Sequence, residues 1–222
     1  MTEQNELHPA EVAKLKAETA KLEAEARAAR ARAKTEEVRA QEESRDEQYR
    51  SAHPEYRGLF YFDNTVNGAS VRAQMHKLET FSFRNPGAPI LVDFNSPGGS
   101  VLDGLAWYDE LRRLSARGHH LTTRVAGVAA SMAGILLQAG DTRIIGPKSW
   151  LHLHEVSSGT IGKASEMMDE AELVKRLTRQ ACDIYADRGN LSSDEVWQLM
   201  ERKEVWLTPE QAKGYGFVDF IS

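Results

Sequence analysis

Along most of the chain, the hydrophobic and polar positions alternate between two periods. Short apolar runs typical of strands occupy 58–66, 90–94 and 121–126. Between them, apolar residues recur every three or four positions over 69–81 and 100–115, which is the spacing of an amphipathic helix. Strands that alternate with helices are typical of parallel βαβ units, so the pattern predicts an α/β fold.

A further, long helix is predicted over 161–188, after the turn residues Ser157-Ser158-Gly159. Its apolar positions are Met167, Met168, Leu173, Val174, Leu177 and Ile184. The flexible methionines suit either a core or an interface with another subunit.

The first fifty residues differ in composition from the rest. Residues 1–50 contain mostly Ala, Glu, Arg and Lys, and no glycine. Small or apolar residues follow each other in steps of three and four, at Val12, Leu15, Thr19, Leu22, Ala26, Ala29 and Ala33. This heptad spacing predicts a helical extension, which is either a solvated single helix or a coiled coil that joins subunits or grips a partner. We therefore expect two parts, 1–50 and 51–222.

Composition narrows the class of protein. The 222 residues, 41% of them hydrophobic, suffice for one α/β domain plus an extension. The net charge of −5, with both signs interspersed, gives no basic footprint for nucleic acid. Neither a signal segment nor an apolar run of membrane-spanning length is evident, so a cytoplasmic location is expected. The single cysteine, Cys182, falls in a helical pattern and is expected to pack in the core.

The segment Gly127-Val-Ala-Ala-Ser-Met-Ala-Gly134 places a lone hydroxyl, Ser131, among small and apolar residues at the start of a predicted helix. Free amides and the helix dipole favour developing negative charge at such a position. Ser131 is therefore a candidate nucleophile. Taken alone, such a serine is more often a small residue at a contact between helices than a nucleophile.

Two adjacent glycines lie upstream, in Asn95-Ser-Pro-Gly-Gly-Ser100, between a predicted strand and a predicted helix. Glycine allows a positive φ and close approach of a ligand to the backbone, so the N–H groups of Gly98 and Gly99 could point into a site. The alternative is a tight turn without a ligand.

The predicted strand Ser149–Val156 carries His152 and His154. Residues two apart share one face of a strand, so both imidazoles point the same way. Either could be the general base for Ser131, or the two could be a metal pair. Zinc needs further ligands, and the sequence has no Cys/His cluster to supply them, so no metal is expected.

Several motifs in order resemble the Clp protease proteolytic subunit (ClpP) family over residues 58–222. They are Asn95–Val101, Gly127–Met132, Leu136–Gly140, the strand ending at His154, Trp206–Ala212 and Tyr215–Asp219. The resemblance implies a Clp/crotonase-like core, a spiral of ββα repeats. It also makes the long helix the family's handle helix, which packs against a partner subunit across stacked rings.

The resemblance also assigns roles to single residues. Ser131 matches the nucleophile, and counting forward from Pro147 places the base on His154. The oxyanion donors match the backbone N–H groups of Gly99 and Met132. No metal or redox cofactor is implied.

The third member of the triad departs from the pattern of cellular relatives. Glu204 stands where those relatives carry aspartate, and glutamate can also hold an imidazole. With a glutamate at this position, the segment resembles that of phage-type members of the family. The run Glu201–Glu204 could instead be a solvated face, and the other candidates are Asp183, Asp187 and Asp194.

The predicted function is a ClpP-like serine endopeptidase that cuts unfolded or flexible polypeptides inside a homo-oligomeric chamber. ATP would enter only through a partner AAA+ unfoldase, although the family's N-terminal docking segment is not recognisable here. One alternative is a phage head-maturation protease acting on capsid or scaffold proteins. The others are an inactive ring-forming interaction subunit and, ranked last, a crotonase-type enzyme acting on acyl thioesters.

Overall fold

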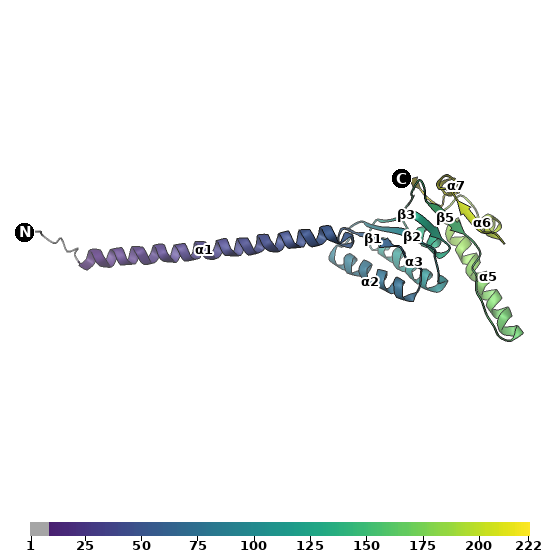
Figure 1. Ribbon diagram of the computed structural model, residues 1–222, viewed down its shortest axis with the longest axis horizontal. Coiled ribbons are helices and arrows are strands. Elements are labelled where there is room, and N and C mark those ends of the chain that lie inside the picture. Colours follow the sequence, from purple (N-terminus) through teal and green to yellow (C-terminus); the bar gives the residue numbers. More distant parts are fainter. Residues whose placement is uncertain (1–8) are drawn as a thin grey trace, which may run out of the picture. The chain divides into compact units, whose positions relative to one another are not determined.

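The computed structural model describes residues 9–222 and divides the chain into two compact units, Met1–His53 and Pro54–Ser222 (Figure 1). The sequence pattern placed this boundary between residues 50 and 51, within the last turn of the first helix. Within the described residues, no helix combines the length and apolar character needed to cross a membrane.

The first unit is one helix, α1 (Pro9–Ala52), of 44 residues. Ion pairs one turn apart, such as Lys21–Glu25 and Arg39–Glu43, run along its surface. The side chains of Leu15 and Leu22, at predicted heptad positions, are exposed in the single chain. From residue 9 onward the extension predicted over 1–50 is helical, and its first eight residues lie outside the described part of the chain. Its coiled-coil pairing stays a prediction.

The second unit is built on a mixed sheet. Its strands are β1 (Leu59–Phe62), β2 (Ile90–Ser96), β3 (Leu121–Ala130), β4 (Thr142–Ile145), β5 (Trp150–Leu153), β6 (Val205–Leu207) and β7 (Phe220–Ile221). The main path is β1-β2-β3-β4-β7, with all neighbours parallel. β5 leaves this path, because it pairs in parallel with β3 and antiparallel with β6.

β3 is shared between two partners, and this division creates the edge on which the site lies. Residues 122–125 pair with β4, whereas residues 128–130 pair with β5. Gly127, with φ of 109°, separates the two halves. A Cβ there would lie 2.5 Å from Oδ1 of Asn95, an atom that accepts a hydrogen bond from the Val128 N–H. Only glycine fits this bend in the strand.

Six helices of the second unit follow in order. They are α2 (Gly68–Arg84), α3 (Val101–Ala116), α4 (Met132–Leu137), α5 (Ala164–Ala186), α6 (Ser193–Met200) and α7 (Pro209–Gly214), after a 3₁₀ turn at Pro54–Arg57. The Asn67 side chain caps α2 by accepting from the Ala69 and Ser70 N–H groups. α2 and α3 lie side by side on one side of the sheet (Figure 1).

The core lies between the sheet and these helices. Phe62 and Phe94 pack edge-on or tilted against Trp107 of α3, with ring centroids 4.7 Å and 5.7 Å away. Trp107 is fully buried, as are Leu111 and Leu114 on the same helix face. The apolar spacing predicted over 100–115 therefore identifies the buried face correctly.

All four predicted strands have different ends in the structure. The run 90–94 continues to Ser96 in β2, and the strand predicted over Ser149–Val156 is reduced to β5, Trp150–Leu153. The run 58–66 forms a strand only as far as Phe62, because Asn64 to Asn67 turn to cap α2. The strand predicted over 121–126 continues to Ala130, because its second half gains β5 as a partner.

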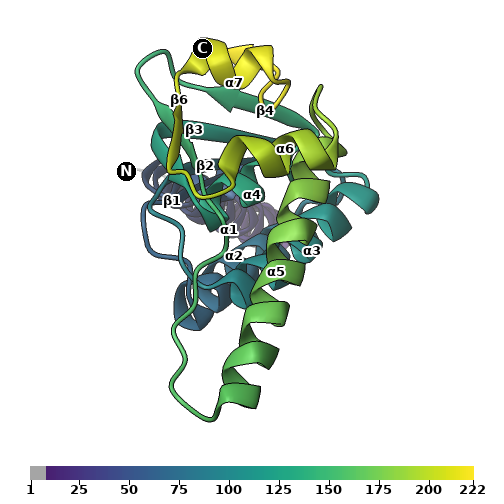
Figure 2. The same cartoon turned by 90° about the vertical axis from the view of Figure 1, so that its right-hand side faces the viewer.

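The long helix predicted over 161–188 is α5, which is shorter at both ends. Its first half projects away from the sheet (Figure 2), and there Met168 is 73% exposed. Its buried residues begin at Thr178 and include Cys182. The apolar positions of the first half are thus uncovered in the single chain.

Candidate active site

Ser131 lies at the junction of β3 and α4, as the N-cap of that helix. Its φ of 54° and ψ of −124° are unusual for a residue with a side chain. The strained turn is held from both sides: the Ser131 N–H donates to the His152 carbonyl at 2.9 Å, and the Gly134 N–H donates to the Ser131 carbonyl at 2.9 Å. The hydroxyl makes no capping bond, so it is available to a substrate.

Gly98 and Gly99 form a turn that leads from β2 into α3, with φ values of 85° and 144°. A Cβ on Gly98 would lie 2.4 Å from the Ala130 carbonyl oxygen and 2.9 Å from the Met132 nitrogen. The turn is fixed by Val66, whose N–H donates to the Gly98 carbonyl at 2.7 Å. This arrangement brings the double glycine directly against the Ser131 turn.

Two backbone N–H groups at this turn are left as free donors. Val66 forms backbone hydrogen bonds with Gly98 and with Ser100, the residues on either side of Gly99. The Gly99 N–H itself donates to no acceptor within residues 9–222. Met132 is the first residue of α4, where an N–H has no partner within the helix. Together these donors can bind an oxyanion.

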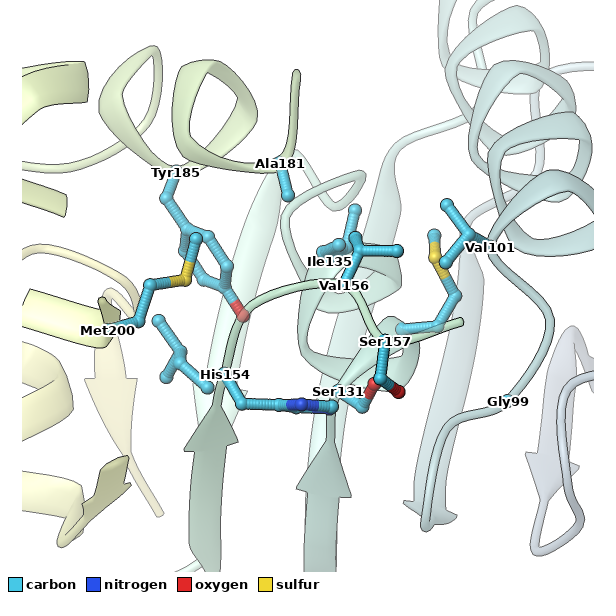
Figure 3. A pocket seen from close by; sticks show the side chains of 12 residues that line it. Gly99, Val101, Ser131, Ile135, His154, Val156, Ser157, Ala181, Tyr185 and Met200 are labelled. Atoms are coloured by element: carbon cyan, nitrogen blue, oxygen red, sulfur yellow. The ribbon is translucent and has the colours of Figure 1, made fainter. Parts of the chain in front are cut away.

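The second imidazole of the predicted pair, His154, lies beside Ser131. His154 follows β5 directly, and both residues line a cleft with an empty volume of about 470 Å³, part of it open to solvent. Gly99 and Met132 line the same cleft. Figure 3 shows the His154 ring extending toward Ser131, with Ser157 next to them.

His152 is part of a stack of three rings. Its ring lies 5.2 Å from that of His154 and 4.2 Å from that of Trp206, at small interplanar angles. The two imidazoles therefore share a face, as the strand alternation predicted. Burial lowers the pKa of His152, the nearby His154 adds to this effect, and Glu204 opposes it.

Glu204 lies between the two imidazoles but closer to the buried one. Its Oε2 is 2.8 Å from Nε2 of His152, without the alignment of a hydrogen bond, and its Oε1 is 4.0 Å from Nδ1 of His154. The Glu204 side chain is 68% exposed. The carboxylate thus lies on the Nδ1 side of His154, as expected for the third member of a triad, but at 4.0 Å it does not form a hydrogen bond with that nitrogen.

The other acidic candidates lie elsewhere. Asp194 pairs with Arg179 at 2.7 Å, and Asp183 accepts from the Ser193 hydroxyl. Asp187 caps the end of α5. None of the three lines the cleft.

Some cleft residues were not singled out from the sequence. Val156, Tyr185 and Met200 form part of its wall. Val156 lies in a loop, Tyr185 in α5 and Met200 in α6. From the sequence alone, each would be expected to be an ordinary residue of the hydrophobic core. Only the three-dimensional arrangement marks them. Within the described part of the chain, no group of three His, Cys, Asp or Glu side chains is placed to hold a metal ion.

Comparison with known proteins decides the family. The sequence profile of the Clp protease family matches residues 41–222, which is most of the chain. The chain belongs to the Clp protease family. The match begins within α1, earlier than the motifs in the sequence suggested. The Clp protease fold accounts for the α/β core, and the predicted family is confirmed.

Curated relatives of this Clp protease agree with the profile. It is similar to the ATP-dependent Clp protease proteolytic subunit of Bacteroides fragilis, with 36% identity over 72% of this chain and 73% of the relative. It is also similar to proteins of that name from Pleurastrum terricola, at 33% identity over 71% and 79%. Subunit 1 from Chlamydia pneumoniae is 31% identical over 72% and 84%. The chain is thus a ClpP-like protease of the serine peptidase type.

Proposed function

We propose that this protein hydrolyses peptide bonds of unfolded or flexible polypeptides with Ser131 as nucleophile and His154 as general base. The proposal is carried by one observation: Ser131, His154 and two free backbone donors line a single cleft. No cofactor of the chain itself takes part.

In this mechanism, His154 takes the Ser131 proton as the serine oxygen attacks the peptide carbonyl carbon. The Gly99 and Met132 N–H groups bind the resulting oxyanion. His154 then gives its proton to the leaving amine, which leaves an acyl-enzyme. A water molecule, deprotonated by His154, releases the acid product and restores the serine. Glu204 supports the imidazolium once its carboxylate turns to Nδ1 of His154.

Assembly and partners are part of the proposal. The relatives are named ATP-dependent proteolytic subunits, and the first half of α5 presents uncovered apolar residues such as Met168. Both support a homo-oligomeric chamber that a partner AAA+ unfoldase supplies with polypeptide. The cytoplasmic location stays a prediction that cell fractionation would test.

A fluorophosphonate probe, which reacts with activated serines, tests the site. We expect the wild type to be labelled and Ser131→Ala to lose labelling. The matched control is Ser157→Ala, which removes the second serine hydroxyl in the cleft and should leave labelling intact. Gel filtration of the same samples establishes assembly. An assembled, folded wild type that stays unlabelled would favour the ring-forming interaction subunit instead.

A further inference from the structure

The cleft continues past Ser131 into an apolar recess. Its walls are the side chains of Ile135, Leu153, Val156, Ala181 and Met200. Among residues 9–222, no Asp, Glu, Lys or Arg side chain lines the cleft. A charged group entering the recess would lose its hydration without a partner, so the recess suits an uncharged side chain.

One polar atom interrupts this apolar wall. Tyr185 of α5 is 2% exposed, and Figure 3 shows its hydroxyl between Met200 and Ile135. Its Oη has no hydrogen-bond partner among the described residues. A buried polar atom without a partner destabilises the fold, so a ligand that reaches Oη and supplies the partner gains affinity.

The surroundings hold this hydroxyl in place. The Tyr185 ring packs against Phe217, with ring centroids 4.7 Å apart. Opposite the hydroxyl stands Gly134, where a Cβ would lie 2.4 Å from Oη. The glycine thus makes room for the hydroxyl within the turn that also carries Ser131.

The chemistry of the hydroxyl defines its partner. Burial raises the pKa of Tyr185 far above its ordinary value, so the group stays protonated. A phenol donates one hydrogen bond and also accepts. The side-chain amide of glutamine does both as well, and it follows an uncharged apolar stem of two methylenes.

The position of the recess defines which substrate residue enters it. A carbonyl carbon at the Ser131 hydroxyl, with its oxygen on the Gly99 and Met132 N–H groups, occupies the mouth of the cleft. We place the side chain of that same residue in the recess, because Tyr185 lines the same cleft as Ser131, Gly99 and Met132.

We infer that Tyr185 is a specificity residue that favours cleavage after glutamine over cleavage after an apolar residue of the same length. This inference rests on the proposed function, because it assumes that Ser131 attacks the carbonyl in this cleft.

The test compares two fluorogenic peptides that differ only at the residue before the cleaved bond, glutamine or norleucine. The quantity measured is the ratio of their kcat/KM values. We expect Tyr185→Phe, which removes only Oη, to lower the glutamine to norleucine ratio about tenfold. The matched control Tyr215→Phe removes a hydroxyl outside the cleft, from a ring that also packs on Phe217, and should leave the ratio unchanged.

The outcomes separate the inference from the proposed function. If both peptides are cleaved and Tyr185→Phe leaves the ratio unchanged, the inference is overturned while the proposed function stands. If a folded wild type cleaves neither peptide and does not react with the fluorophosphonate probe, both are overturned. Thermal unfolding of Tyr185→Phe serves as the folding check, and its midpoint should not fall, because the variant buries one unpartnered polar atom fewer.

Discussion

At the scale of single residues, backbone conformation determines the site more than side-chain identity does. Ser131 keeps a positive φ that glycine would adopt more easily. Gly98 and Gly99 are needed because a Cβ on either would collide with backbone atoms, of Ala130 and Val66 respectively. The proposed oxyanion donors, Gly99 and Met132, act through main-chain N–H groups, so the proposed function depends on these contacts.

Gly98→Ala should therefore impair catalysis strongly. The new Cβ would meet the Ala130 carbonyl and the Met132 nitrogen, and the turn would have to move away from Ser131. We expect kcat for peptide cleavage to fall at least about a hundredfold, the typical effect of losing an oxyanion donor. The control is Gly118→Ala, which also has a positive φ, of 95°, but has open space around it. Equal activity of the two variants would contradict this account.

His152 should make the stability of the protein depend on pH. Its pKa is lowered by burial, so the unfolded chain binds a proton more readily than the folded one. This contribution is complete above the ordinary histidine pKa of about 6.5 and is lost as the pH falls below it. We expect urea unfolding of His152→Gln to depend less steeply on pH than wild type between about pH 6.5 and 5. Parallel curves would show that His152 does not cause the dependence.

At the scale of elements, the hydrophobic pattern predicted a feature correctly where that feature depends only on residues within one helix or strand. The apolar face of α3 and the shared face of the two histidines follow from local periodicity. The ends of β1 and β3 did not follow, because the Asn67 cap and the pairing with β5 decide them. The position of Glu204 relative to the two histidines could not be predicted from the sequence either. It depends on the register in which β6, the strand after Glu204, pairs with β5.

An ion pair with a buried guanidinium lies beside the pairing of β4 with β7. Arg143 is almost fully buried and contacts Asp219 at 2.7 Å. Burial raises the pKa of Asp219, but hydrogen bonds from Arg143 outweigh this effect and lower it. Asp219→Ala would leave the guanidinium with Gln138 as its remaining side-chain partner. We expect a loss of about 3 kcal/mol in the free energy of unfolding by urea.

Asp194→Ala provides the comparison, because it breaks the exposed pair with Arg179. Its cost should stay below about 1 kcal/mol. A similar cost for both variants would show that burial of Arg143 does not govern the effect.

The reactivity of the single cysteine, Cys182, can show whether the buried end of α5 stays packed against the core. Burial raises the pKa of Cys182 to about 11, and its side chain is fully buried. The thiol should therefore resist iodoacetamide at pH 8 in the folded protein and react once urea unfolds the chain. Rapid labelling of the native protein, followed by mass spectrometry, would mean that this end of α5 detaches.

At the scale of the whole molecule, the core belongs entirely to the second unit. Every residue of the described core cluster lies between Phe60 and Ile221. A chain that starts at Pro54 should accordingly keep the thermal midpoint of the full chain while losing the far-ultraviolet helix signal of α1. A clear drop in the midpoint would show that α1 stabilises the catalytic unit.

The two halves of the proposed active site differ in how firmly the surrounding structure holds them. The Ser131 turn and the double glycine are tied to Val66 and to the His152 carbonyl, within one chain. Glu204, by contrast, is mostly exposed and stands 4.0 Å from His154. In the proposed mechanism, control of the activity therefore acts more easily through the Glu204 carboxylate than through Ser131. A latent state of the protein would keep Ser131 in position, and it would become active when the Glu204 carboxylate rotates toward His154.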